Sequence, residues 1–150
     1  MKKYEEIRTL LSVIEPQEEM YSSITVEDIP LLKKLLNEGE TWLAARAIFA
    51  LSRLNLPKSH AIIIQSLKDK RSEIRIAIAA VSNLLPNDIN EKIYPKLLLD
   101  EDLGVKKFAI QSLPINIASK LLIALKKVSV NDNNEYIKKL SLDKIYQIQK

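Results

Sequence analysis

Cysteine is absent from this 150-residue chain, and glycine and histidine are scarce, with two glycines and one histidine. Without cysteine there is no disulfide, thiolate metal site or thiol nucleophile. Two glycines are too few for a glycine-rich phosphate loop. The single histidine, His60, excludes a histidine-rich metal centre and leaves at most one imidazole base. We therefore predict no cofactor, no metal and no catalytic residue, and we expect His60 to be an exposed residue at the start of a helix.

Long apolar runs are also absent. No stretch approaches the roughly 20 apolar residues that span a bilayer. The first six residues, Met-Lys-Lys-Tyr-Glu-Glu, lack the apolar segment of a signal peptide. We therefore expect a cytoplasmic protein with no membrane partner. The net charge of +4, from 23 basic and 19 acidic residues, is compatible with an anionic partner and does not require one.

What the sequence does contain is a repeat of 31 or 32 residues. Three columns of equivalent residues define it. Aliphatic residues stand at the zero position, and these are Leu43, Ile74, Val105 and Ile137. Acidic residues precede them by five, and these are Glu38, Asp69, Asp100 and Asp132. Aliphatic residues precede them by seven, and these are Leu36, Leu67, Leu98 and Val130. Repeats of this length are typical of solenoids and helical arrays.

Each repeat has the pattern of two helices joined by a turn. Apolar residues recur at spacings of three and four on both sides of the acidic column. Prolines 57, 86 and 114 fall at or after the ends of successive second helices, where a proline cannot continue the hydrogen-bond ladder. Both glycines, Gly39 and Gly104, fall in the turns. We predict that Asp69, Asp100 and Asp132 are structural. They satisfy turn or helix-start amides and face Arg75, Lys106 or Lys138.

The predicted domain organisation is a single domain over residues 1–150. Residues 1–25 form an N-terminal cap, with a helix from about Lys2 to Ile14 that Pro16 ends. The four repeats cover approximately residues 26–57, 58–88, 89–116 and 117–150. The last repeat carries outward polar residues and serves as the C-terminal cap.

The repeat resembles short HEAT-type repeats, including the variety named from the phycobilisome lyases. The resemblance depends on the acidic turn residue, on aliphatic-basic pairs such as Ile74-Arg75 and Val105-Lys106, and on small and aliphatic residues four and five positions later. It covers about residues 26–150. It implies an all-α, right-handed α-solenoid of about four helix pairs with an N-terminal capping helix. It also implies that second helices line a concave surface.

A candidate partner-binding surface follows from helix geometry, because some positions on each second helix point away from the repeat core. The predicted residues are Trp42, Arg46, Phe49, Arg53, Asn83, Lys107, Gln111 and Lys139. Exposed aromatic residues beside arginines are typical of binding hot spots. The alternative is that Trp42 and Phe49 pack beneath the N-terminal helix, since a terminal repeat needs an apolar cap.

Three functions remain open from the sequence. The first is a non-enzymatic scaffold or adaptor that binds another protein on the concave face, and for it we expect a monomer. The second is nucleic-acid binding, in the manner of the HEAT-like alkylpurine DNA glycosylases, because basic residues lie near aromatics. The third is an accessory or lyase-like protein that binds a chromophore, as the resemblance to the lyase repeats implies.

Overall fold

The computed structural model describes residues 1–13 and 17–150, and the part of the chain that it describes is helical and contains no strand. The α-helices are α1 (Tyr4–Leu11), α2 (Ile29–Glu38), α3 (Thr41–Leu54), α4 (Pro57–Gln65), α5 (Ser72–Val81), α6 (Asn87–Leu97), α7 (Leu103–Ser112), α8 (Ser119–Asn131) and α9 (Glu135–Gln149). Short 3-10 turns are η1 (Glu18–Tyr21), η2 (Val26–Asp28), η3 (Ser66–Lys68) and η4 (Ser82–Leu84). The prediction of an all-α fold is confirmed.

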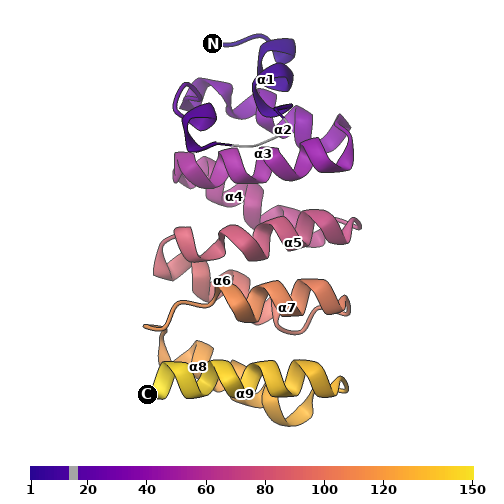
Figure 1. Cartoon of the computed structure of the whole chain (residues 1–150). Coiled ribbons are helices and arrows are strands. Elements are labelled where there is room, and N and C mark those ends of the chain that lie inside the picture. The colour runs from indigo at the N-terminus through magenta and orange to yellow at the C-terminus, as the bar shows by residue number, and fades with distance from the viewer. Residues whose placement is uncertain (14–16) are drawn as a thin grey trace. The chain divides into compact units, whose positions relative to one another are not determined.

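The helices follow one another in pairs, α2–α3, α4–α5, α6–α7 and α8–α9, as Figure 1 shows by colour along the chain. The chain divides into two compact units, residues 1–78 and 79–150, and the boundary falls inside α5. In the first unit α1 packs on α2 and α3, and α2 packs on α3. In the second unit α8 packs on α9, and α6 packs on both α7 and α8. The four predicted helix pairs are therefore present.

The repeat frame defines the core of both units. Second helices contribute the zero column, whose members are fully buried, and these are Leu43, Ile74, Val105 and Ile137. First helices contribute a second column at a strict 31-residue step, also fully buried, and these are Leu32, Ile63, Tyr94 and Leu125. Burial of a large apolar side chain contributes about 1.5–3 kcal/mol relative to full exposure, so these columns contribute substantially to stability.

One assigned column position is wrong. Val130 was placed with Leu36 and Leu98, which are 3% and 1% exposed, but Val130 itself is 70% exposed. The fourth repeat is one residue longer, and the extra residue lies after Leu125, at the end of α8. Counting in the 31-residue step of the first helices places the buried Ser129 where Leu98 stands in the third repeat.

The acidic turn residues bind backbone amides, as predicted. Asp69 accepts the backbone N–H of Arg71 at 2.9 Å, and Asp100 accepts that of Asp102 at 2.9 Å. Asp132 accepts the N–H of Asn134 at 2.8 Å. Each carboxylate thus closes the same turn, three residues before the first residue of its helix, in the arrangement called an Asx turn.

The residue two positions after the acidic one caps the following helix where its side chain is short and polar. Asp102 accepts the N–H of Val105, and Asn134 accepts that of Ile137, both at 3.0 Å. In the second repeat Arg71 occupies this position, and its guanidinium donates to the carboxylate of Asp69 and to the carbonyl of Leu36 at 2.8 Å. The turn therefore ties one repeat to the one before it.

The N-terminal cap is a shorter helix than predicted, α1, with Ile7 and Leu11 fully buried. The predicted helix end at Ile14 and its stop at Pro16 lie outside the described residues. The entry to α2 is a capping box, in which the fully buried Asp28 accepts the backbone N–H of Thr25 at 2.9 Å. Asp28 also pairs with the Lys2 ammonium at 3.1 Å, which fastens the start of the chain.

The expected exposure of His60 is wrong. The helix α4 begins at Pro57, so His60 lies within its first turns and is only 8% exposed. Its Nε2 lies 2.6 Å from Oδ1 of Asn55, the one described non-glycine residue with a positive φ, at 51°. The side chain satisfies a polar group beside a left-handed helix end, which gives it a structural role.

Candidate binding surfaces

In the first unit, Trp42 and Arg46 form an aromatic-cationic pair on α3. The Trp42 side chain is 47% exposed, and its Nε1 donates to Glu40 at 2.9 Å. The Arg46 guanidinium lies 5.2 Å from the centre of the Trp42 ring, within the range of a cation–π interaction. Arg46 also donates to the carbonyl of Leu11 at 2.8 Å and to that of Val13, so the end of α1 holds it in place.

Further along α3, Arg53 contacts the segment that follows α1, and Phe49 lines a pocket together with residues of that segment. Arg53 forms an ion pair with Glu18 at 2.6 Å. Its guanidinium lies 4.8 Å from the ring centre of Tyr21 and 5.7 Å from that of Phe49. The hydrogen bond from Arg53 lowers the pKa of the Glu18 carboxylate, and burial raises the pKa of Tyr21.

These residues enclose a pocket of about 260 Å³. Its lining comprises Gln17, Glu18, Tyr21, Arg46, Phe49 and Arg53. The two interpretations from the sequence, a binding hot spot and packing beneath the N-terminal helix, each describe part of this arrangement. Arg46 and Arg53 hold the N-terminal segment, whereas Trp42 faces solvent and Phe49 is only half-buried. We use the name "α3 cluster" for Trp42, Arg46, Phe49 and Arg53.

The remaining predicted binding residues lie in the second unit. Asn83 is exposed in η4, Gln111 is exposed on α7, and Lys139 is exposed on α9, while Lys107 on α7 is half-buried. Helices α7 and α9 pack together, so their basic and polar residues share one unit. A hydrogen bond also joins the two helices, because the Lys144 ammonium donates to the carbonyl of Gln111 at 3.2 Å. Burial lowers the pKa of Lys144.

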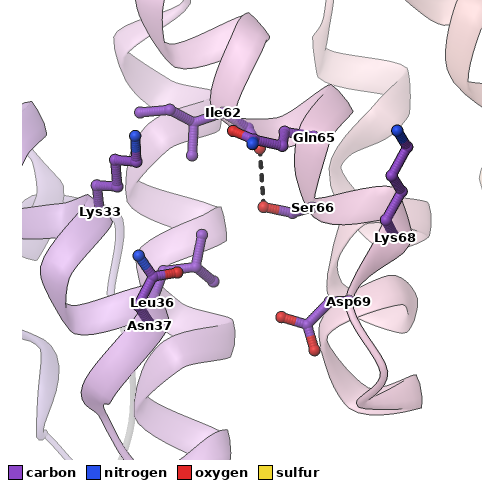
Figure 2. Close-up of a pocket in the computed structure, with 8 residues that line it drawn as sticks. All are labelled: Lys33, Leu36, Asn37, Ile62, Gln65, Ser66, Lys68 and Asp69. Carbon is purple, nitrogen blue, oxygen red and sulfur yellow. Dashed lines mark hydrogen bonds between the residues drawn. The ribbon is translucent and has the colours of Figure 1, made fainter.

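Grooves also lie between the first helices of neighbouring repeats, and they were not predicted from the sequence. One lies between α2 and the α4–η3 segment, with a volume of about 330 Å³. In Figure 2, Lys33 and Asn37 face Ser66, Lys68 and Asp69 across this space. Its charges are already partly matched, because Asp69 is paired with Arg71 at 2.9 Å. A second groove lies between α6 and α8. The signal that could have found both was present in the repeat frame, as the lining residues of first helices occupy the same columns.

Comparison with known proteins gives the fold and no family. No family model matches the sequence, and no curated protein matches it. Among solved structures, the chain is similar to a designed armadillo repeat protein in complex with the peptide (KR)4. The TM-score is 0.56 with 18% sequence identity, over 95% of this chain and 80% of that one. The chain therefore has the fold of a helical-repeat solenoid. No helix of the described residues is long and apolar enough to cross a membrane.

Proposed function

We propose that this protein is a non-enzymatic binding module that grips a segment of another protein, with the α3 cluster as its anchor. The observation that carries the proposal is the exposed Trp42 side chain and the contacts that hold it. A large aromatic side chain stands half-exposed in the first unit and is held by Glu40 and Arg46, and Arg46 also lines a pocket that contains two more aromatic rings. A fixed aromatic residue loses little side-chain entropy when a partner covers it, which is why such residues dominate binding energies.

The chemistry of the cluster indicates a partner segment that combines an apolar side chain with a carboxylate. Two arginines lie among the rings, and Arg53 already holds the carboxylate of Glu18. The designed armadillo protein was solved with a basic peptide. Because the α3 cluster is itself cationic, we expect the opposite preference here. Lys107, Gln111 and Lys139, together with Asn83, remain the proposed contacts of the second unit.

The test is a peptide selection followed by a mutational comparison. A random-peptide display library is selected on the wild-type protein, and the dissociation constant of the best peptide is measured by fluorescence anisotropy. Replacing both Trp42 and Phe49 with alanine is expected to weaken binding by about 2 kcal/mol, close to 30-fold. The matched control replaces two exposed aromatics of the second unit, Phe108 and Tyr146, and is expected to leave affinity within about twofold of wild type.

The outcomes separate the proposal from its alternatives. Normal binding by a folded Trp42→Ala, Phe49→Ala protein would refute the anchor, and enrichment of basic peptides would refute the proposed charge preference. Nucleic-acid binding remains a separate hypothesis, in which affinity for labelled DNA falls steeply with salt.

We also infer that the repeats are of the HEAT type. What supports this is the content of each repeat, two helices within 31 or 32 residues, whereas armadillo repeats have three helices. The cytoplasmic location and the monomeric state are part of the same proposal. Size-exclusion chromatography with light scattering tests the second of these, and a mass of twice 17.1 kDa would contradict it.

A further inference from the structure

The groove between α6 and α8 is an apolar depression in the second unit. Its volume is about 400 Å³, and its lining comprises Pro95, Leu98, Leu99, Lys120, Ile123, Ala124, Lys127 and Val128. Six of these eight residues are apolar. Leu99 is 78% exposed and Ile123 is 56% exposed, so two large aliphatic side chains of the lining face water. Such exposure is costly, because each could contribute about 1.5–3 kcal/mol if a partner buried it.

The repeat architecture does not require this apolar lining. The groove between α2 and α4 is built from the same columns two repeats earlier, and its residues are more polar. Asn37 stands where the second groove has Leu99, and Lys33 stands where it has Pro95. Likewise, Gln65 and Ser66 precede Lys127 and Val128 by the same two repeats. A solvated first-helix groove is thus compatible with the fold, and the apolar lining distinguishes the α6–α8 groove from the α2–α4 groove.

Two lysines mark the ends of the apolar stretch on α8. Lys120 and Lys127 are seven residues apart, which is two turns or about 10 Å along the helix, and both are exposed. Ile123 and Ala124 lie between them. Neither lysine forms an ion pair with any residue that the structure describes, in contrast to Lys106 of the same unit, which is paired with Asp132. The groove therefore presents an apolar floor with a cation near each end.

We propose that this groove binds an amphipathic helix of a partner protein, with two acidic residues placed two turns apart on either side of an apolar stripe. A helix laid in a groove uses anchors at spacings of three, four and seven, which match an apolar floor two turns long. The two separate cations favour this occupant over a fatty acid, whose single carboxylate would use only one of them. Charge complementarity at both ends also fixes the register of the helix.

The experiment uses the full chain and helical peptides of defined pattern. The probe is an alanine-rich peptide, acetylated and amidated at its ends, with two glutamates two turns apart and leucines between them. A library displays variants of this peptide in which the residues at the leucine and glutamate positions vary. Binding of the best peptide is measured by fluorescence anisotropy. We expect enrichment of acidic residues at the flanking positions and of Leu, Ile or Phe in the stripe.

A groove exchange provides the decisive variant and its matched control. Leu99→Asn in the turn after α6, with Lys127→Gln on α8, introduces the residues of the polar groove at two exposed positions. This variant is expected to bind the peptide at least tenfold more weakly, with unchanged circular dichroism and melting temperature. The reciprocal change, Asn37→Leu with Gln65→Lys, leaves the proposed groove intact and is expected to leave this affinity unchanged.

Several results would overturn the inference. These are the absence of enrichment over scrambled peptides, an enriched peptide that binds the Leu99→Asn, Lys127→Gln protein normally, or enrichment of basic flanking residues. Binding to vesicles of phosphatidylserine and phosphatidylcholine that is lost in the same variant, without competition from the peptide, would assign the groove to a membrane surface. The Trp42→Ala, Phe49→Ala protein is expected to bind the helical peptide normally, so the two proposals can fail independently.

Discussion

The partly buried pair of Asp132 and Lys106 allows a direct test of what the acidic column contributes. The Asp132 side chain is 7% exposed and accepts two hydrogen bonds, one from the Lys106 ammonium at 2.7 Å and one from the backbone N–H of Asn134 at 2.8 Å. Asparagine retains a neutral acceptor for both donors but loses the charge. Alanine removes the acceptor completely and leaves two donors without a protein partner.

The expected magnitudes follow from these contacts. A hydrogen bond to a charged group contributes about 1.5–3 kcal/mol, and a neutral one about 1 kcal/mol. The Lys106 side chain is 18% exposed, so water can solvate its ammonium in the mutant and reduce the loss. We therefore expect Asp132→Asn to lower the free energy of unfolding by about 1 kcal/mol, and Asp132→Ala by about 2–3 kcal/mol.

Urea denaturation followed by circular dichroism measures both changes. The control is Asp143→Ala, which alters an exposed carboxylate on α9 and is expected to change the free energy of unfolding by less than about 0.5 kcal/mol. Equal losses for Asp132→Asn and Asp132→Ala would show that the charge pair dominates and that the turn acceptor contributes little. The same ordering is expected for Asn and Ala at Asp100, which closes the equivalent turn.

Three further predictions concern acid, alkali and backbone packing. The hydrogen bonds from Arg71 lower the pKa of Asp69 in the folded protein. The stability from this contact is therefore present above the unfolded pKa near 4 and is expected to fall as the pH drops below it. Urea titrations at pH 3 and pH 7 measure the loss. Burial raises the pKa of Tyr94 to about 12, despite its hydrogen bond with Ser112, so the free energy of unfolding is expected to fall as the pH rises above 10. Tyr94→Phe should remove this dependence at a cost of about 1 kcal/mol, and alkaline denaturation measures both effects. Gly39→Ala would place its Cβ 2.5 Å from the carbonyl oxygen of Leu35, and we expect about 1–3 kcal/mol of destabilisation by thermal melting, with no loss meaning that the turn relaxes freely.

Periodic features of the sequence predicted the fold well because each repeat buries the same columns. The zero column from Leu43 to Ile137 is fully buried throughout, and the acidic column closes the same turn in the later repeats. The predictions for Val130 and His60 were wrong because the repeat pattern is interrupted or absent at these residues. Val130 was misplaced because an extra residue interrupts the frame at the end of α8. The burial of His60 depends on Asn55 in a left-handed conformation, which no repeat pattern encodes.

The candidate site was less predictable, for a physical reason. Helix geometry correctly placed Trp42 away from the core, but it could not show that Arg53 would bind Glu18 or that Arg46 would bind the carbonyl of Leu11. Those contacts come from a non-repeating segment whose path depends on tertiary packing. The apolar groove was within reach of the sequence, because a comparison of Asn37 with Leu99 in the aligned columns shows the change of polarity without any structure.

The left-handed residue Asn55 allows backbone strain and side-chain bonding to be separated at one position. Its φ of 51° costs an alanine about 1–2 kcal/mol but costs a glycine almost nothing. Its Oδ1 lies 2.6 Å from Nε2 of His60, a hydrogen bond that both replacements remove at a cost of about 1 kcal/mol. We therefore expect Asn55→Gly to lose about 1 kcal/mol and Asn55→Ala about 2–3 kcal/mol in urea denaturation, with the difference equal to the strain. If the two variants were equally stable, the end of α3 would have to adopt another backbone conformation in the alanine protein, and the contact with His60 would then account for the whole effect.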